Sequence, residues 1–451
     1  MERRTSMRLL LAGGSVFRDG GFQPLEIAVS EGRIVSVSPR LPRDGAAVIE
    51  LNHHFIVPGF VDVHVHLREP GFSYKETIAS GTAAAAAGGY TALCAMPNLD
   101  PVPDSPDRLQ VELEAIRRDA RVHVYPYGAI TQGEKGASLA DLAALAPYVP
   151  GFSDDGRGVQ SREMMRRAML LAKKLDRPIV AHCEDESLLD KGWCVHDGEF
   201  AKRHGLPGND PASEWRQVER DIQLVRETGC RYHVCHISTK ESVTLVRAAK
   251  AQGLPVTCET GPHYLCLCDE DLEDDGRFKM NPPIRSAADR DALVEGLLDG
   301  TVDCVATDHA PHSAEEKARG LRGSLNGVVG LECAFPVLYT ELVKTGKVPL
   351  ETILNALCVN PRRIFGLPGG TIAEGQPADL TVLSFDHAGT VDPAGFRSLG
   401  RATPFAGRRV EAAVSMTLVG GNIVFPEGLK PSPSGTIGII RGYDRPEGGE
   451  P

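Results

Sequence analysis

The stretch GFVDVHVHLREPG, residues 59–71, decides the fold class. It reads as an apolar strand that ends in His64 and His66. Side chains two residues apart on a strand point to the same face, so both imidazoles are expected to face the same space. An open doubly wound sheet usually has a glycine-rich phosphate loop after its first strand, and here histidines stand at that place. The stretch therefore favours the first strand of a parallel barrel with its chemistry at the mouth.

Seven further apolar segments follow along the chain, with amphipathic helices between them. The segments are TALCAMPN (91–98), RVHVYPYG (121–128), VPGFSDD (149–155), PIVAHCED (178–185), RYHVCHIS (231–238), PVTCET (255–260) and VDCVATDH (302–309). Pro106 is predicted to open one of the helices, because proline is favoured in a first helical turn. Strands that alternate with helices in this way predict an α/β fold, a (β/α)8 TIM-type barrel over residues 58–365.

Short strand-like runs at both ends of the chain predict a second, smaller domain. They are LLLAG (9–13), LEIAVS (25–30) and RIVSVS (33–38) near the N-terminus, and TIAEGQPADLTVLSFD (371–386) and VEAAVSMTLVGGNIVF (410–425) near the C-terminus. Either set alone has too few strands to bury a core. We therefore expect residues 1–57 and 366–451 to form one small β-sandwich domain, with a disordered tail over 443–451.

Composition narrows the classes of function. The chain has 451 residues, of which 42% are hydrophobic and 24% charged, an ordinary globular balance. Lys and Arg number 49 against 60 Asp and Glu, and this net charge of −11 argues against a nucleic-acid partner. No run approaches the roughly 18 apolar residues that span a membrane. The 11 cysteines include no C-x-x-C pair, so we expect reduced thiols and a cytoplasmic protein.

Titratable residues recur at the ends of the predicted barrel strands, where barrel enzymes carry their chemistry. Besides the two histidines of the first strand, they are Asp154, Asp155, His182, His236 and Asp308. One histidine on a strand is usually a core residue, but four with carboxylates at one mouth indicate a metal site. Imidazole and carboxylate ligands suit Zn²⁺, and their number favours two ions over one, with one aspartate bridging the two.

Several motifs resemble those of the class I bacterial dihydroorotase family, within the amidohydrolase superfamily. They are GFVDVHVHLREPG (59–71), AMPN (95–98), FSDDG (152–156), AHCED (181–185), HVCHIS (233–238), KMNPPIR (279–285) and ATDHAPH (306–312). The resemblance implies zinc-dependent, reversible cyclisation of N-carbamoyl-L-aspartate to L-dihydroorotate, the third step of pyrimidine synthesis. It implies as zinc ligands His64, His66, Asp155, His182, His236 and Asp308. Asp155 is chosen over Asp154 because its spacing to His182 fits the family.

The implied substrate carries a carboxylate and a ring imide, and the chain offers side chains for both. Arg68 can present a planar, two-pronged guanidinium to the carboxylate. Asn98 and Asn281 are neutral amides that can hold imide or carboxylate oxygens. The resemblance adds contacts to the substrate from His66, His312, Asn326 and Gly327. Asp308 is expected to be the catalytic group that takes a proton from water and returns it to the leaving nitrogen.

Two other functions remain open from the sequence. An allantoinase or hydantoinase would share the metal site, although its ring has no carboxylate for Arg68 to bind. A catalytically silent homologue that serves as a scaffold for aspartate transcarbamoylase would be expected to lose ligands, and all six are present. We also expect a homodimer, and the sequence leaves open whether it associates with aspartate transcarbamoylase. The polar segment 310–323 is either a lid over the substrate or a plain exposed loop.

Overall fold

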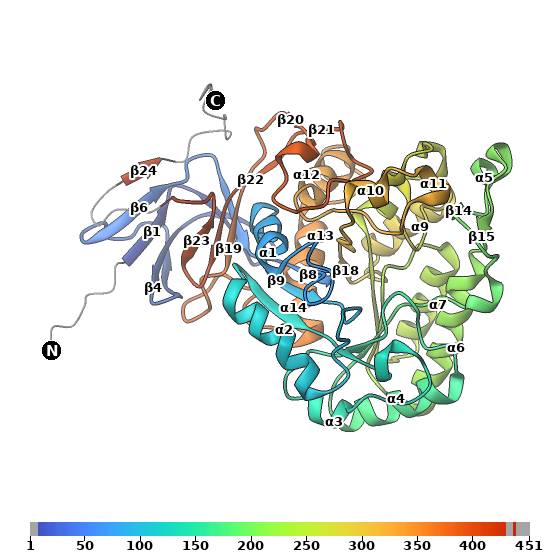
Figure 1. Ribbon diagram of the computed structural model, residues 1–451. Coiled ribbons are helices and arrows are strands. Elements are labelled where there is room, and N and C mark those ends of the chain that lie inside the picture. The colour runs from blue at the N-terminus through green and yellow to red at the C-terminus, as the bar shows by residue number, and fades with distance from the viewer. Residues whose placement is uncertain (1–7, 430–435, 439–451) are drawn as a thin grey trace.

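The structure is a computed structural model that describes residues 8–429 and 436–438. A barrel wrapped in helices lies beside a smaller β-sandwich that contains strands from both ends of the chain (Figure 1). This arrangement confirms the predicted α/β fold class. The disorder predicted for residues 443–451 concerns a segment outside the described residues. None of the described helices is long and apolar enough to cross a membrane.

Short parallel strands form the wall of the barrel. They are β8 (Phe60–Val65), β9 (Tyr90–Ala95), β10 (His123–Pro126), β11 (Gly128–Ala129), β12 (Phe152–Ser153), β13 (Ile179–Ala181), β16 (Tyr232–Val234), β17 (Val256–Thr260) and β18 (Cys304–Val305). Two hydrogen-bonded arcs result, β10-β9-β8 and β11-β12-β13-β16-β17-β18. Tyr127 separates β10 from β11 and donates its N–H to the Ala95 carbonyl (2.9 Å). On the other side the His66 N–H donates to the His309 carbonyl (2.8 Å), which brings the first and last strands together.

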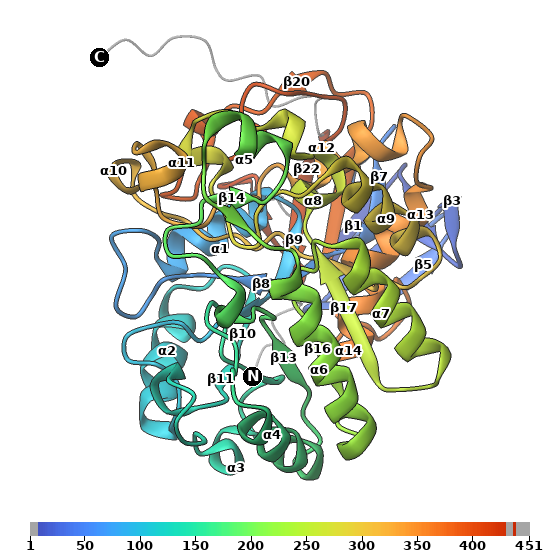
Figure 2. The same ribbon diagram turned by 90° about the vertical axis from the view of Figure 1, so that its right-hand side faces the viewer.

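Helices cover the outside of this wall (Figure 2). They are α1 (Ile78–Ala87), α2 (Pro106–Asp119), α3 (Leu142–Leu145), α4 (Arg162–Lys174), α6 (Ala212–Thr228), α7 (Lys240–Ala251), α9 (Ala287–Leu298) and α12 (Ala334–Leu338), with α13 (Leu350–Leu354) and α14 (Asn360–Phe365) after them. Pro106 opens α2, as predicted. Because helices cover one face and the barrel interior the other, β8 and β9 are buried along their whole length. A Cβ on Gly88, which ends α1, would lie 2.0 Å from the Leu331 carbonyl oxygen, so this close packing requires glycine.

Two sheets make the β-sandwich. Its strands are β1 (Arg8–Ala12), β2 (Ser15–Arg18), β3 (Gly21–Pro24), β4 (Glu26–Ser30), β5 (Arg33–Ser38), β6 (Ala46–Glu50), β7 (Phe55–Pro58), β19 (Leu380–Ser384), β22 (Ala413–Val419), β23 (Asn422–Phe425) and β24 (Thr436–Gly438). The sheet orders are β24-β6-β1-β4-β5 and β23-β22-β19-β7-β2-β3. Alternate strand residues such as Ile27, Ile56 and Leu380 meet in a core between them. β19 lies between β7 and β22, which joins the two ends of the chain.

The segment from β20 (Gly389–Thr390) to β21 (Arg409–Val410) packs on the barrel. Phe405 shares a buried cluster with Phe278, and the Val329 N–H donates to the Ala402 carbonyl (2.8 Å). This segment lies within the range 366–451 that the sequence assigns to the small domain. The division of the chain at residues 57/58 and 365/366 stays a prediction.

Candidate active site

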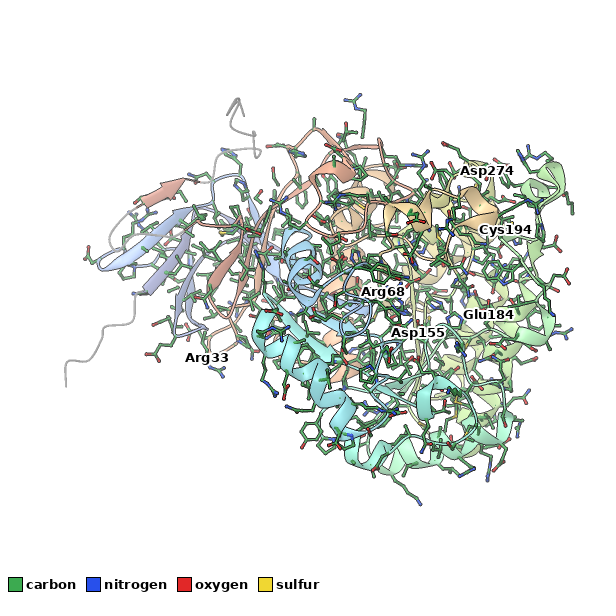
Figure 3. The ribbon with its side chains drawn as sticks, in the orientation of Figure 1. Arg33, Arg68, Asp155, Glu184, Cys194 and Asp274 are labelled. Carbon is green, nitrogen blue, oxygen red and sulfur yellow. The ribbon has the colours of Figure 1, made fainter. Side chains whose placement is uncertain are left out.

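Six predicted ligands converge in the barrel mouth, and all of them are buried. They come from the carboxyl ends of five strands: His64 and His66 from β8, Asp155 after β12, His182 after β13, His236 after β16 and Asp308 after β18. This is the edge where side chains of parallel barrel strands meet. Figure 3 shows Asp155 with Arg68 in the middle of the barrel half.

Asp155 lies between two pairs of histidines. On one side, its carboxylate oxygens are 3.3 Å from His64 Nε2 and 3.4 Å from His66 Nε2. On the other side, its Oδ1 is 3.7 Å from His182 Nδ1 and 3.8 Å from His236 Nε2. Those two nitrogens are 3.0 Å apart. The carboxylate therefore faces all four imidazoles at once.

Asp308 lies beside the first of these pairs, His64 and His66. Its Oδ1 lies 3.1 Å from His66 Nε2 and 3.6 Å from His64 Nε2. Its backbone has a φ of 47°, and that of His236 has a φ of 30°, a left-handed conformation that is costly for residues other than glycine. Such strain is tolerated where the surrounding structure holds the residue in place, and it gathers at functional sites. Both strained residues aim their side chains at the same cluster.

The cluster fits a metal ion. His64 Nε2 and Asp155 Oδ1 are buried and have no hydrogen-bond partner among the described residues, an arrangement that costs free energy unless another group binds there. Ligand atoms of His64, His66 and Asp308 lie within 4.8 Å of one another, as do those of His64, Asp155 and His236. Imidazole nitrogen with carboxylate oxygen is a donor set that divalent transition metals bind. The site is thus a buried His/Asp metal-binding cluster.

The neighbouring carboxylate, Asp154, points away from this cluster. Its Oδ1 accepts hydrogen bonds from the backbone N–H groups of Ile130 (2.8 Å) and Thr131 (3.0 Å). Burial raises the pKa of Asp154 to about 6. Burial also opposes ionisation of Asp155, but the nearby histidines, His64 above all, hold the pKa of Asp155 well below its ordinary value. Only Asp155 is both ionised and directed at the histidines.

We expect Asp155→Asn to lower the number of metal ions retained per chain, because the amide removes the negative charge between the histidine pairs. Asp154→Asn should keep the metal content of the wild type, since its remaining oxygen can still accept from the same backbone N–H groups. Atomic emission analysis of the desalted proteins measures both. Loss of metal from the Asp154 variant alone would show that the wrong carboxylate was chosen.

Three further residues support the histidines, and two of them, Glu259 and Asp62, were not identified from the sequence. Glu259, at the end of β17, accepts a hydrogen bond from His64 Nδ1 (2.7 Å). Asp62 accepts from the backbone N–H groups of His64 and Thr307 (both 3.0 Å) and so joins the first strand to the last. Asn98 Oδ1 accepts from His66 Nδ1 (2.8 Å). The available signal was position, because Glu259 ends a barrel strand as the ligands do.

A cavity of about 210 Å³ opens beside the cluster, and the residues predicted to contact a substrate line it. Its lining includes His66, Arg68, Asn98, Asn281, His312, Asn326 and Gly327, together with ligand residues. Arg68 is buried and donates from Nε to the Pro311 carbonyl (3.2 Å). Its guanidinium is therefore the cation that a ligand in this cavity meets.

His312 has both ring nitrogens engaged. Nε2 donates to the Asn326 carbonyl (2.7 Å), so Nδ1 accepts from Lys75 Nζ (3.1 Å). Burial, then the charges of Arg68 and Lys75, lower the pKa of His312 to about 3, so the ring is neutral at physiological pH. Lys75 also pairs with Glu316 (3.1 Å). Lys75 is a second cation behind the cavity wall, and the sequence analysis did not identify it.

The remaining predicted contacts are partly engaged with the protein itself. Asn281 Nδ2 donates to Glu184 Oε2 (3.1 Å). The Gly327 N–H donates to the Lys279 carbonyl (3.0 Å). A Cβ on Gly327 would lie 2.6 Å from the Ala310 carbonyl oxygen, and its φ of 133° also favours glycine. Gly327 thus brings its chain segment close to the cavity.

The segment 310–323 contains two short helices, α10 (Ala314–Lys317) and α11 (Gly320–Gly323). Lys317, the last residue of α10, anchors this segment through its side chain. Its buried Nζ donates to the carbonyls of Lys279 (2.9 Å), Leu325 (2.8 Å) and Gly327 (2.7 Å). Three acceptors match the three N–H donors of an ammonium group. The middle of the segment is therefore held by the loop at Lys279 and by the residues that follow the segment, and its role as a lid stays a prediction.

Comparison with known proteins gives two family models and close relatives that span most of the chain. The family described as Dihydro-orotase-like matches residues 53–242, and the Amidohydrolase family matches residues 245–425. The dihydroorotase of Geobacillus sp. strain WCH70 is 49% identical over 426 residues, which cover 94% of this chain and 100% of that protein. The dihydroorotase of Bacillus caldolyticus is 50% identical over 419 residues, 92% and 98% of the two chains.

Solved structures share the fold. The L-hydantoinase (dihydropyrimidinase) of Arthrobacter aurescens superimposes with a TM-score of 0.83 at 26% identity, covering 96% of this chain and 99% of that one. The D-hydantoinase (dihydropyrimidinase) of Thermus sp. gives a TM-score of 0.79 at 23% identity and covers 96% and 98%. A barrel joined to a β-sandwich is common to these proteins and this chain.

Proposed function

The chain belongs to the dihydroorotase family of amidohydrolases, and from this premise we propose that it interconverts N-carbamoyl-L-aspartate and L-dihydroorotate in a zinc-dependent reaction. The observation that carries the proposal is the cavity itself. It joins the buried His/Asp cluster to Arg68, so a ring amide and a carboxylate of one small molecule can meet the two at once. Hydrolysis of the amide needs the His/Asp cluster, and recognition of the substrate carboxylate needs Arg68.

We assign two zinc ions to the cluster. His64 and His66 would hold one and His182 and His236 the other, with Asp155 between them and Asp308 on the first. Zinc, when bound, polarises a carbonyl and supplies hydroxide at neutral pH. Asn98 accepts from Nδ1 of His66 and so orients the ring, whose Nε2 faces Asp308 and the proposed zinc position.

Arg68 would bind the carboxylate of the substrate through a charge-assisted, two-pronged hydrogen bond. This contact orients the ring, with its scissile amide toward Asp155 and Asp308. Asn281 and the backbone at Asn326 and Gly327 would complete the binding of the ring. Neutral His312 fixes the wall beside Arg68 without adding a charge of its own.

Asp308 would move the proton. In the hydrolytic direction its carboxylate accepts a proton from the attacking water and delivers it to the departing ring nitrogen. In the direction of cyclisation the same carboxylate would take the proton from the carbamoyl nitrogen and deliver it to the oxygen that leaves as water. Burial alone would raise the pKa of Asp308, but hydrogen bonding and charge from the histidines lower it, so the group starts as a base.

A spectrophotometric assay of dihydroorotate hydrolysis, run beside hydantoin and allantoin, tests the proposal. We expect turnover of dihydroorotate to exceed that of both other rings. Preferred hydrolysis of hydantoin or allantoin would replace the proposal with the corresponding activity. A zinc-free chain with no turnover of any ring would instead indicate the scaffold function.

His182→Ala is expected to lower zinc content and activity together. The change removes the imidazole whose Nδ1 faces His236 and Asp155, so one zinc position loses a ligand. Zinc per chain and dihydroorotate turnover are measured on the same preparation. Unchanged zinc in this variant would exclude His182 from the metal site.

The proposed reaction consumes the product of aspartate transcarbamoylase, and we therefore propose that the chain associates with that enzyme. We propose in addition that the chain acts in the cytoplasm as a homodimer. Light scattering of the purified protein measures the oligomeric state, and co-elution with the transcarbamoylase measures the association. A monomer that elutes alone would contradict both.

A further inference from the structure

Glu259 lies behind the metal-binding cluster, at the end of β17, and is fully buried. Three groups on two other strands contact its carboxylate. Oε1 is 2.7 Å from His64 Nδ1 and 3.3 Å from the backbone nitrogen of His236, and Oε2 is 3.1 Å from His233 Nε2. One oxygen thus touches a ligand from each of the two histidine pairs.

We propose that Glu259 is a positioning residue that keeps both histidine pairs, His64 with His66 and His182 with His236, in the orientation that binds metal. The inference rests on the proposed zinc-dependent function and adds a determinant of metal affinity outside the ligand set. Carboxylates that accept from the far nitrogen of a metal-binding histidine fix its orientation and increase its basicity.

Glu259 determines which nitrogen of the His64 ring carries the hydrogen. A carboxylate only accepts hydrogen bonds, so the nitrogen that faces Glu259 must carry the hydrogen. In the metal-bound protein the ring is neutral, so with its one hydrogen on Nδ1 the Nε2 lone pair is directed to the side of Asp155 and Asp308, whose oxygens are 3.3 and 3.6 Å away. Without Glu259 the ring could take the other tautomer, which cannot bind a metal from Nε2.

A second chain of contacts holds the carboxylate itself. His233 is also fully buried, and its Nε2 donates to Glu259 Oε2, which leaves Nδ1 as an acceptor. The Thr257 hydroxyl lies 2.8 Å from that Nδ1 and can donate to it. Thr257 and Glu259 lie on the same face of β17, two residues apart. The carboxylate therefore has one orientation in which every neighbouring donor is satisfied.

Glu259 also contacts the backbone of His236. Its φ of 30° is unfavourable for a histidine, and the hydrogen bond from its N–H to Glu259 Oε1 supports that conformation. The His236 ring belongs to the second histidine pair, whereas the His64 ring belongs to the first. Loss of Glu259 should consequently weaken metal binding at both positions.

Glu259→Gln tests this with little change in volume. The amide has one acceptor oxygen and one donor group, so it cannot accept from His64, His233 and the His236 N–H together. We expect zinc affinity to fall by about 10- to 100-fold, the usual effect of losing such a partner. Equilibrium competition with a chromophoric chelator measures the affinity, and the visible spectrum of the cobalt-substituted protein measures ligand geometry.

Asp221→Asn is the matched control. Asp221 is another fully buried carboxylate; it accepts from the Tyr232 hydroxyl (2.8 Å) on β16 and pairs with Arg220 (2.9 Å), away from the metal cluster. Its substitution should leave zinc affinity at the wild-type value. If folded Glu259→Gln bound zinc as tightly as the wild type, the role of Glu259 would be overturned and the proposed function would stand. A wild type that binds no zinc would overturn the proposed function and the inference with it.

A measurement on the unaltered zinc protein covers the case in which Glu259→Gln does not fold. Nitrogen-15 spectra of histidine-labelled protein report which ring nitrogen carries the hydrogen. We expect His64 to be protonated at Nδ1 and His233 at Nε2. Protonation of His64 at Nε2 would overturn the assigned role of Glu259.

Discussion

Asp308→Asn is expected to lower kcat for dihydroorotate hydrolysis by about 10²- to 10⁴-fold, the usual contribution of a positioned proton-transfer group. The amide keeps the size of the side chain and an oxygen that can face His66 Nε2, 3.1 Å away in the native site. It cannot accept the proton of water and return it to the ring nitrogen. Steady-state kinetics with a substrate titration measure the change.

KM for dihydroorotate should change much less than kcat in this variant, because Arg68 and the rest of the cavity are unaltered. Asp303→Asn is a suitable control, since Asp303 lies just before β18 at the far end of the same strand and pairs with Lys250. That control should turn over substrate as the wild type does. Activity of Asp308→Asn within tenfold of wild type would contradict the proton-transfer role.

Periodicity alone predicted much of the barrel and of the cluster. His64 and His66 are two residues apart on one strand, so their common direction follows from the pleat. The positions of His182, His236 and Asp308 follow from one rule, that the carboxyl ends of parallel strands meet at one rim. The choice of Asp155 over Asp154 depended on the resemblance to the dihydroorotase family. The structure brings these six side chains together, although their roles as zinc ligands remain predictions.

Other features depend on contacts that no local pattern contains. Lys75 reaches His312 across 237 positions of sequence, and this contact exists only because the segment after β18 folds back over the barrel mouth. The segment 389–410 has no strong periodicity, and it packs on the barrel through backbone bonds such as that from Val329 to Ala402. Glu259 differs from these, since its place at a strand end was visible in PVTCET (255–260). It was missed because that strand ends in no histidine or aspartate.

The fold does not separate dihydroorotase from hydantoinase, because solved hydantoinases superimpose on this chain over almost its whole length. Discrimination must come from a residue that meets the substituent in which the substrates differ. Dihydroorotate has a carboxylate, whereas hydantoin and 5,6-dihydrouracil have none. Arg68 is the buried cation that lines the cavity, and burying a guanidinium without an anion would cost free energy.

Arg68→Met should therefore lower kcat/KM for dihydroorotate and for carbamoyl-aspartate by roughly ten- to a few hundredfold, since a hydrogen bond to a charged group contributes about 1.5–3 kcal/mol. Arg68→Lys should recover only part of the loss, because an ammonium cannot form the two-pronged contact. Turnover of 5,6-dihydrouracil should be poor and equal in wild type and both variants, and zinc content should not change. If Arg68→Met hydrolysed dihydroorotate as well as the wild type, another residue would bind the carboxylate, and the choice of dihydroorotate over hydantoin would lose its physical basis in this cavity.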